Sequence, residues 1–530
     1  MHKYERSLGW VLRHQFFMIL VTLTTVVVTV YLYIIIPKGF FPQQDTGRLQ
    51  GTILGDQNIS FQAMQKLVSR FASEVGQDPA VSTVSASVGG SSAINSGRMF
   101  VSLKPQGERK LTGDQVVARL RGKLGHITGG TLYLKVVQEL SVGGRNTSAQ
   151  YQYTLQDDDL VELNTWATVM LNKMKQLPGM VDVNSDQQDS GLAAPFTVDR
   201  DTASRLGITA QAVDSALYDA FGQREVSTMY TPLNQYYVVM EVEPKFWQSP
   251  EGRKYVYVQG ANNAQVPLTA ITRYAPNTTS LAVNHSGQFP SVTLSFNLAP
   301  GFSLGTAVTE IAQAQHELGM PPTLRGKFFG TAQAYQDSLA NEPILIAAAL
   351  VSVYIVLGIL YESLIHPLTI LSTLPSAGVG ALLSLLFFKI DLSIIALIGI
   401  ILLIGIVKKN AIMMIDFALE AERRGEPPEK AIYQACLRRF RPIMMTTLAA
   451  MFGGLPLALG GGTGSELRQP LGIAIVGGLL FSQMLTLYTT PVVYIYLDRF
   501  QSCCRRLRPA RQGAPTPSAM AVPSAPGSHP

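Results

Sequence analysis

Six long stretches of this chain carry almost no charge, and they limit its fold more than any other feature of the sequence. They are residues 16–36, 343–361, 368–388, 392–419, 443–459 and 471–497. Each is close to or above the roughly 17–25 residues with which an apolar helix crosses the hydrocarbon core of a bilayer. Charged residues make up only 15% of the chain, whereas soluble domains contain about 25%. The sequence therefore predicts an α-helical polytopic membrane protein with six transmembrane helices.

The first stretch is longer than the apolar region of a secretory signal, and no small-residue cleavage site separates it from Lys38. We expect it to stay in the mature protein. Lysine and arginine residues gather before the first stretch, between the fourth and the fifth, and after the sixth. Because cationic loops stay in the cytoplasm, we expect both termini to be cytoplasmic and residues 38–341 to lie outside.

The net charge of +6 belongs to the cytoplasmic side, because the external segment has 24 Lys and Arg residues against 25 Asp and Glu residues. Attraction to anionic lipid accounts for such charges, so no nucleic-acid partner is expected. All three cysteines follow residue 435. Packing, without disulfides, must therefore hold the external segment together.

The external segment changes to short strand and helix patterns, which are typical of α+β modules. Residues 38–150 predict the order β-α-β-β-α-β, the ferredoxin-like arrangement. Residues 151–341 predict a second unit of this kind, interrupted at about 195–289 by an insertion with its own strands and helices. Residues 1–37 then hold the N-terminus and the first span, residues 342–498 a five-helix bundle, and residues 499–530 a disordered cytoplasmic tail rich in Pro, Ala and Ser.

Motifs of soluble enzymes do not occur in the sequence. It has no Gly-x-Ser-x-Gly, no phosphate-binding loop and no His/Cys cluster with metal spacing, and its seven histidines are scattered. We therefore predict that the protein is not an enzyme and holds no metal or cofactor. If it transports a substrate, the energy comes from an ion gradient or from a partner.

Two lysines and an aspartate interrupt the fourth apolar stretch, at Lys408, Lys409 and Asp416. One interpretation ends the span at residue 407 and lets the lysines reach the cytoplasmic interface. The other keeps them about three turns inside, because apolar sequence continues to residue 419. Lys409 and Asp416 then share a helix face but lie ~10 Å apart along its axis, so a buried Lys409 needs an acidic partner on another helix.

The start of the fifth stretch places Arg439 and Thr446 seven residues apart, hence on one face. They can be an interface anchor and a threonine bonded to its own helix, or polar groups that face Lys409. The other spans offer no carboxylate at membrane depth, since Glu342, Glu362 and Asp498 lie at span ends. The acidic partner of Lys409 is therefore expected on another chain.

Five motifs follow one another along the chain: PKGFFPQQDTG, YESLIHPLTIL, GIVKKNAIMMIDFA, RFRPIMMTTLAA and LRQPLGIAIVGG. In this order they resemble the motifs in the C-terminal half of resistance–nodulation–division (RND) multidrug efflux permeases, from the N-terminus to about residue 500. The resemblance implies an inner-membrane, proton-driven exporter of drugs or other amphiphilic molecules. It also implies a periplasmic part made of porter subdomains and an inserted docking subdomain.

By this resemblance Lys409 falls on the proton-relay lysine, Thr446 on the relay threonine and Arg439 on the arginine that lines the same path. Lys408 and Asp416 receive no relay role. The Gly-rich stretch between residues 89 and 97 falls on a loop near the substrate pocket. Its candidate residues are Gly89, Gly90, Ser91, Ser92, Asn95 and Gly97.

Full permease subunits of this family are about twice as long and carry the relay carboxylates in their N-terminal half. The resemblance therefore implies that this chain works with an N-terminal half or a sister permease subunit, in a trimer that docks a periplasmic adaptor protein and an outer-membrane channel. Two other hypotheses stay open: a truncated fragment without transport, and a membrane scaffold or sensor.

Overall fold

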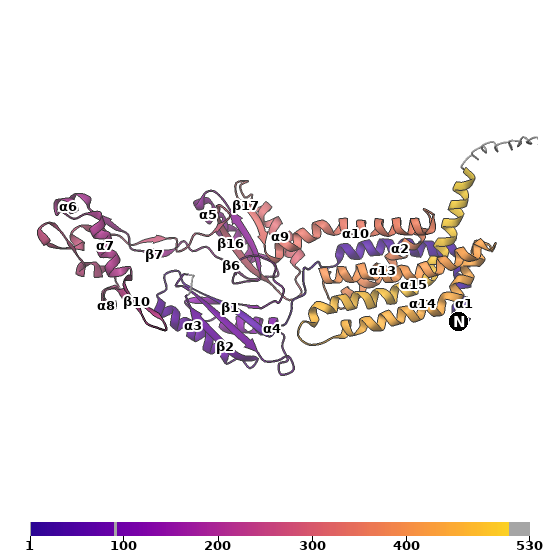
Figure 1. The fold of residues 1–530 in the computed structure, drawn as a ribbon, viewed down its shortest axis with the longest axis horizontal. Helices are drawn as coiled ribbons and strands as arrows, with labels where there is room; N and C mark the ends of the chain where they lie inside the picture. Colours follow the sequence, from indigo (N-terminus) through magenta and orange to yellow (C-terminus); the bar gives the residue numbers. More distant parts are fainter. Residues whose placement is uncertain (1, 90–92, 248, 508–530) are drawn as a thin grey trace, which may run out of the picture.

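The computed structural model describes residues 2–89, 93–247 and 249–507. The molecule is elongated, with a helical bundle at one end, two sheet-containing modules beside it and a smaller unit at the far end (Figure 1). Of the tail predicted to be disordered, residues 508–530 lie outside the described residues. Residues 499–507 were predicted wrongly, because they continue the last helix, which ends at Leu507.

Within the described residues, six helices are long and apolar enough to cross a membrane, in agreement with the number predicted from the sequence. After the short helix α1 (His2–Arg13), they are α2 (Gln15–Ile35), α10 (Thr331–Tyr361), α11 with α12 (His366–Leu371 and Leu374–Phe387), α13 (Ile394–Arg423), α14 (Pro428–Leu459) and α15 (Ser465–Leu507). Helix α2, from the start of the chain, packs against α12 and α15, so that residues far apart in sequence form one bundle (Figure 1).

The cationic segment between the fourth and fifth spans is shorter than the sequence pattern suggests. Helix α14 starts at Pro428, so the only residues between α13 and α14 are 424–427. The first turns of α14 are helical because they have an apolar side, whose residues Ala431, Ile432 and Ala435 are buried in the bundle. Arg438, Arg439 and Arg441 therefore lie on a helix.

The first module has the strand and helix order expected from the sequence. Its elements are β1 (Arg48–Gly55), α3 (Phe61–Gly76), β2 (Val81–Val88), β3 (Ser96–Leu103), α4 (Gly113–Leu124) and β4 (Gly130–Val136). The strands form an antiparallel sheet in the order β2-β3-β1-β4. Buried and exposed residues alternate along β3, so one sheet face packs against α3 and α4.

The second module repeats this order around an insertion. Its elements are β5 (Tyr151–Gln156), α5 (Leu160–Gln176), β6 (Met180–Ser185), β16 (Phe289–Leu298), α9 (Leu304–Glu317) and β17 (Arg325–Phe329). Strand β16 pairs with β5 and with β6, and β5 pairs with β17. Helix α10 begins two residues after β17 and contacts it, which ties this module directly to the membrane bundle.

The insertion between β6 and β16 forms the unit at the far end of the molecule (Figure 1). Its elements are β7 (Gly191–Ala193), β8 (Phe196–Val198), α6 (Arg200–Arg205), α7 (Ala210–Phe221), β9 (Arg224–Tyr230), β10 (Gln235–Met240), α8 (Pro244–Trp247), β11 (Tyr257–Gln259), β12 (Gln265–Pro267), β13 (Thr272–Tyr274) and β14 (Asn277–Thr279), with three short 3-10 helices, Pro250–Tyr255, Ala261–Asn263 and Leu268–Ala270. The next strand, β15 (His285–Ser286), pairs with β16 in the sheet of the second module. Strands β7 and β14 pair as an antiparallel ribbon at the point where the chain leaves the second module for the insertion and later returns from it. A separate apolar core includes Val213, Val258 and Leu268.

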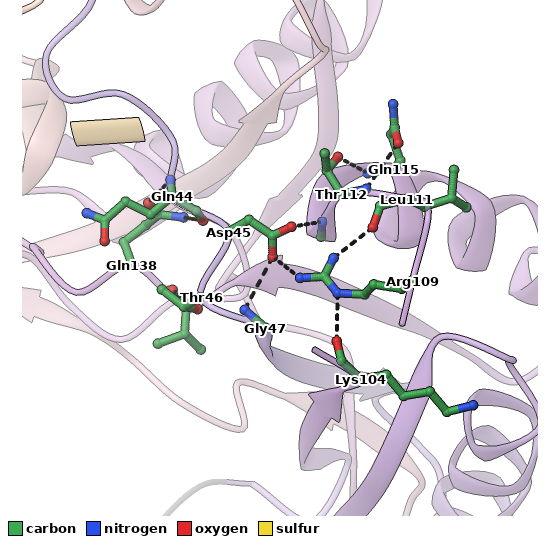
Figure 2. Close-up of polar contacts among 12 residues, drawn as sticks. Gln44, Asp45, Thr46, Gly47, Lys104, Arg109, Leu111, Thr112, Gln115 and Gln138 are labelled. Carbon is green, nitrogen blue, oxygen red and sulfur yellow. Dashed lines mark hydrogen bonds and ion pairs between the residues drawn. The ribbon is translucent and has the colours of Figure 1, made fainter. Parts of the chain in front are cut away.

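A buried ion pair holds the segment between α2 and β1 to the first module (Figure 2). Arg109 Nη2 lies 2.6 Å from Asp45 Oδ1, and the backbone N–H of Gly113 donates to Asp45 Oδ2 at 2.9 Å. Arg109 also donates to the carbonyl oxygens of Lys104 and Leu111, each at 2.8 Å. Burial alone would raise the pKa of the Asp45 carboxyl, but the Arg109 and Gly113 hydrogen bonds and the Arg109 charge outweigh it, so this pKa is lowered.

A second ion pair joins the two modules. Arg121 on α4 donates from Nε and Nη2 to the carboxylate of Asp182 on β6, with Nε 2.6 Å from Oδ1. Asn297 Nδ2 on β16 donates to the same carboxylate at 2.9 Å. Asp182 has a φ of 55°, a left-handed conformation that is uncommon outside glycine. Arg145, in the segment between β4 and β5, forms a longer pair across the same boundary, with Nη1 3.8 Å from Asp186 Oδ2.

Candidate functional site

Lys409 lies on the outer side of α13, as do Ile398, Leu402, Gly405 and Asp416. We call these five residues the open face of α13. Within the part of the chain that the structure describes, Lys409 has no hydrogen bond and no salt bridge. Its charge is therefore presented outward from a helix that is otherwise long and apolar enough to cross a membrane.

Arg439 lies on α14, next to the Asp416 end of the open face. Its guanidinium carbon is 5.3 Å from the ring centre of Phe417, and that of Arg438 is 5.5 Å from the same ring. Nε of Arg439 is buried and has no hydrogen-bond partner among the described residues. A buried donor left without an acceptor costs about 1–3 kcal/mol. This arginine is therefore stacked on an aromatic ring but incompletely bonded.

Thr446 is half-buried on α14. Its hydroxyl donates to the carbonyl oxygen of Ile443 at 3.1 Å, the bond to its own helix that one of the two interpretations predicts. The hydroxyl oxygen can still accept a hydrogen bond. The adjacent Thr447 is buried instead and points toward the interior of the bundle, where it contacts other helices.

Three polar residues behind the candidate relay were not predicted from the sequence. Asn410 on α13 and Thr447 on α14 follow Lys409 and Thr446 directly, and both hydrogen-bond to Gln483 on α15. None of the three carries a charge, so they do not stand out from the apolar stretches as Lys409 and Asp416 do. The sequence did contain a signal for them, because Asn410 and Gln483 each place an amide within an apolar stretch, and a polar side chain in hydrocarbon requires a partner.

The Gly-rich stretch lies between β2 and β3, in the first module and away from the bundle (Figure 1). Gly89 has a φ of +76°, and the Asn95 side chain is buried and donates to the Gly55 carbonyl oxygen at 3.3 Å. Gly97 lies in β3, where an added Cβ would come within 2.9 Å of Val68 Cγ2. Gly90, Ser91 and Ser92 lie outside the described residues. The predicted site residues thus fall in two separate parts of the molecule.

A cavity of about 390 Å³ is lined by both modules, by the segment after α2 and by the loop between α12 and α13. Its lining combines the aromatic residues Phe40, Tyr151 and Phe302 with residues of both charges: acidic Asp114 and Asp391, and basic Arg121, Lys135 and Lys389. Burial raises the pKa of the Asp391 carboxyl, and burial together with the charge of nearby Asp45 raises that of Asp114. The cavity therefore offers aromatic surface beside two carboxyls that take up protons more readily than usual.

Comparison with known proteins agrees with the five motifs. Residues 1–498 match the model of the AcrB/AcrD/AcrF family. The multidrug resistance protein MdtC of Escherichia coli (strain SMS-3-5 / SECEC) is 55% identical over 499 residues, which cover 94% of this chain and 49% of the relative. MdtC of Salmonella agona (strain SL483) is 56% identical, over 94% of this chain and 48% of the relative. This chain thus spans about half the length of the curated relatives it matches.

Solved structures share the fold. The crystal structure of a heavy metal efflux pump superimposes with a TM-score of 0.86 at 22% sequence identity, over 94% of this chain and 52% of that chain. A second crystal form of such a pump gives a TM-score of 0.83. The match over residues 1–498 and the close relatives show that this chain belongs to the AcrB/AcrD/AcrF family of RND multidrug efflux permeases.

Proposed function

We propose that this chain supplies one side of a proton relay and half of the porter in an inner-membrane efflux permease. The observation that carries the proposal is Lys409, a cation on the open face of a membrane-length helix, without a hydrogen bond or salt bridge to any described residue. A lysine at the centre of a membrane span is unfavourable by about 2.5–3.5 kcal/mol. A complementing helix that brings a carboxylate to this face removes that penalty.

In the proposed relay, the ionised carboxylate of the complementing half pairs with Lys409. When that carboxylate takes up a proton, Lys409 loses its counter-charge, and the contacts that hold α13 change. Arg439 has an unsatisfied Nε with which to bind an acceptor, and Thr446 has a free hydroxyl lone pair beside the same path. Proton binding thereby changes the preferred position of α13. No cofactor is required, because the proton gradient supplies the energy.

The same proposal assigns the external part. We infer that both modules are ferredoxin-like porter subdomains, which the sheet order β2-β3-β1-β4 and its near repeat in the second module support. The insertion is assigned to docking, on the strength of its separate core and its position farthest from the bundle (Figure 1). Both termini are placed in the cytoplasm and the external part in the periplasm, on the distribution of Lys and Arg.

Substrates and partners follow from the family. The relatives named MdtC are multidrug resistance proteins, and we propose that this chain takes part in exporting drugs or other amphiphilic small molecules. The cavity, with its aromatic surface and charged residues of both signs, suits such amphiphilic molecules. An N-terminal half or sister subunits complete a trimer, which works with a periplasmic adaptor and an outer-membrane channel.

The test is drug accumulation in bacteria that lack their own pumps, with this chain expressed alone or together with a candidate N-terminal half. Accumulation should fall only when both are present, and Lys409→Ala should abolish the effect. Lys408→Ala is the matched control, since it removes the neighbouring lysine that is half-buried and off the open face. It should retain most of the export.

Two results would contradict the proposal. If accumulation stays unchanged in every combination and the two chains do not co-purify, the chain is a fragment without transport. If export is restored equally by the wild type and by Lys409→Ala, no relay passes through this lysine, and a scaffold role accounts better for the chain.

A further inference from the structure

Behind the open face, three helices are joined by a closed triangle of hydrogen bonds. Asn410 Nδ2 donates to Thr447 Oγ1 at 3.0 Å and to Gln483 Oε1 at 3.2 Å. Thr447 Oγ1 donates to the same Gln483 oxygen at 2.8 Å. Gln483 Nε2 lies 3.4 Å from the sulfur of Met444, which turns its oxygen toward the two donors. Each of α13, α14 and α15 thus contributes one member.

The triangle lies in the interior of the bundle. Asn410 and Thr447 are each only 5% exposed and Gln483 is half-buried, and the spans around them are apolar. In hydrocarbon, no water replaces a lost partner for an amide or a hydroxyl group. The three side chains therefore have to satisfy one another, and the arrangement is specific because the single oxygen of Gln483 accepts from two helices.

The position of the triangle bears on the relay residues, because two of its members follow them directly in the chain. Successive residues of an α-helix point about 100° apart. Holding Asn410 toward Gln483 fixes the rotation of α13 and so directs Lys409 to the open face. Holding Thr447 toward Gln483 fixes α14 in the same way and sets the direction of Thr446.

We propose that Asn410, Thr447 and Gln483 are positioning residues of the relay, which fix the rotation of α13 and α14 and hence the placement of Lys409 and Thr446. This inference rests on the proposed function. The three residues do not receive the proton themselves. They keep the lysine where the carboxylate of the complementing half can reach it.

The test uses this chain together with its complementing half in proteoliposomes, with drug transport driven by an imposed proton gradient. Thr447→Val removes the hydroxyl at nearly constant volume. The maximal rate should fall at least about tenfold, since small displacements of reacting groups have effects of this size. The half-saturating drug concentration should stay unchanged, because drug binds outside the bundle. Thr447→Ser, which keeps the hydroxyl, should restore the rate.

Thr490→Val is the matched control. Thr490 lies on α15, is fully buried, and its hydroxyl has no hydrogen-bond partner among the described residues. The same chemical change there should leave the rate unchanged. If Thr447→Val fails to reach the membrane, Gln483→Met replaces it as the test. This substitution keeps the size of the side chain but removes the oxygen that accepts both hydrogen bonds, and the maximal rate should fall by the same factor.

The outcomes separate the two proposals. A wild-type rate for Thr447→Val or for Gln483→Met, in an assay where Lys409→Ala abolishes transport, overturns the positioning role and leaves the relay intact. An equal loss in Thr490→Val also overturns it, since the effect would then come from any change in the buried core. Unimpaired transport by Lys409→Ala would contradict the proposed relay, and therefore also the positioning role that rests on it.

Discussion

Asp45 is the residue on which the junction between α2 and the first module depends most. It lies in the motif PKGFFPQQDTG, which directly follows the first span. Its partner Arg109 is 64 positions away in the sequence, and the side chains of the two are 9% and 3% exposed. Removing one member of such a pair leaves the other charge buried and unpaired, which is far more costly than losing a surface contact.

Asp45→Asn should therefore destabilise the first module strongly. We expect a loss of about 3–5 kcal/mol in its free energy of unfolding, because Arg109 keeps its charge without a counter-ion. Hydrogen exchange of the core amides of Leu49 and Val101, followed by mass spectrometry on the purified chain, measures this loss.

Glu74→Gln is the matched control for this substitution. Glu74 and Lys123 form a partly exposed pair at 3.3 Å in the same module, and such pairs contribute about 0–1 kcal/mol. Equal effects of Asp45→Asn and Glu74→Gln would show that the buried pair contributes no more than a surface pair.

The lowered pKa of Asp45 also predicts how the module responds to acid. The folded carboxyl binds protons less readily than the unfolded one, whose pKa is close to the ordinary value of 3.8. The unfolded state therefore holds more protons between the two pKa values, and stability rises with pH in that interval. The contribution of Asp45 is fully present above about pH 4 and is lost as pH falls through the folded pKa. Unfolding curves of Asp45→Asn at several acid pH values should lack this component.

At the scale of single residues, a charged residue within an apolar stretch was the feature of the sequence that pointed to the candidate site. Lys409 could be singled out because a cation within a membrane span requires an explanation. The pairing of Asp45 with Arg109 and the contacts of Gln483 could not be predicted, because each joins segments that are distant in sequence, and one sequence carries no record of which of them meet. The relay roles of Lys409, Thr446 and Arg439 stay predictions.

Among the helices, the backbones of α12 and α15 approach each other closely at two glycines. An added Cβ at Gly380 would lie 2.6 Å from Phe481 Cβ and 2.8 Å from the carbonyl oxygen of Gly477. At Gly477 it would meet the Ser384 hydroxyl oxygen at 1.9 Å. Only glycine fits at these two positions, because the neighbouring helix leaves no room for a Cβ, as is common where transmembrane helices pack tightly.

Gly380→Ala should therefore lower the melting temperature of the detergent-purified chain. A forced separation of two packed helices costs about 1–3 kcal/mol, which corresponds to a shift of several degrees. Gly453→Ala is the comparison, since nothing lies within 4 Å of a Cβ there. If both variants melt at the same temperature, the close contact of α12 and α15 does not limit stability.

The pattern of apolar residues predicted that these helices exist but not where they begin. The apolar stretch at 343–361 lies in a helix that starts at Thr331, and the stretch at 443–459 lies in one that starts at Pro428. Hydrophobicity marks the part of a helix that meets lipid. The hydrogen-bonded backbone continues further wherever one face of the helix still has something to pack against, and for α14 this is the cluster around Ile432 and Cys436.

At the scale of the whole molecule, the Arg121–Asp182 pair governs how the two modules are held relative to each other. Arg121→Gln should loosen them, because it removes the salt bridge that joins α4 of the first module to β6 of the second. Spin labels at Lys66→Cys on α3 and Lys175→Cys on α5, introduced after replacement of the native cysteines, should report a broader distribution of distances.

Arg119→Gln tests whether this effect is specific. Arg119 lies on the same helix with the same side-chain exposure, 39%, but it pairs with Asp78 inside the first module at 2.6 Å. The distance distribution should stay narrow in this variant. Equal broadening of the distance distribution in both variants would mean that the substitutions disturb α4 itself. The Arg121–Asp182 pair would then contribute nothing specific to holding the two modules together.

The order of strands and helices in the external part was predictable, because alternation and helical periodicity are local properties of a sequence. The pairing of Arg121 with Asp182 across the modules was not, since it uses an aspartate with a left-handed φ at a shift in strand register. No local pattern marks such a position. The porter and docking assignments of these parts remain proposals for the same reason: fold alone does not fix a role.

The open face of α13 bears on how long the chain survives in a cell. In the proposed permease, a copy that enters the membrane without its complement exposes Lys409 and Asp416 to lipid, and such a polar stripe distinguishes an unassembled subunit from an assembled one. Membrane proteases that survey for such stripes would degrade the surplus. The amount of this chain would then follow the supply of its complement, and assembly would set the stoichiometry without matched rates of synthesis.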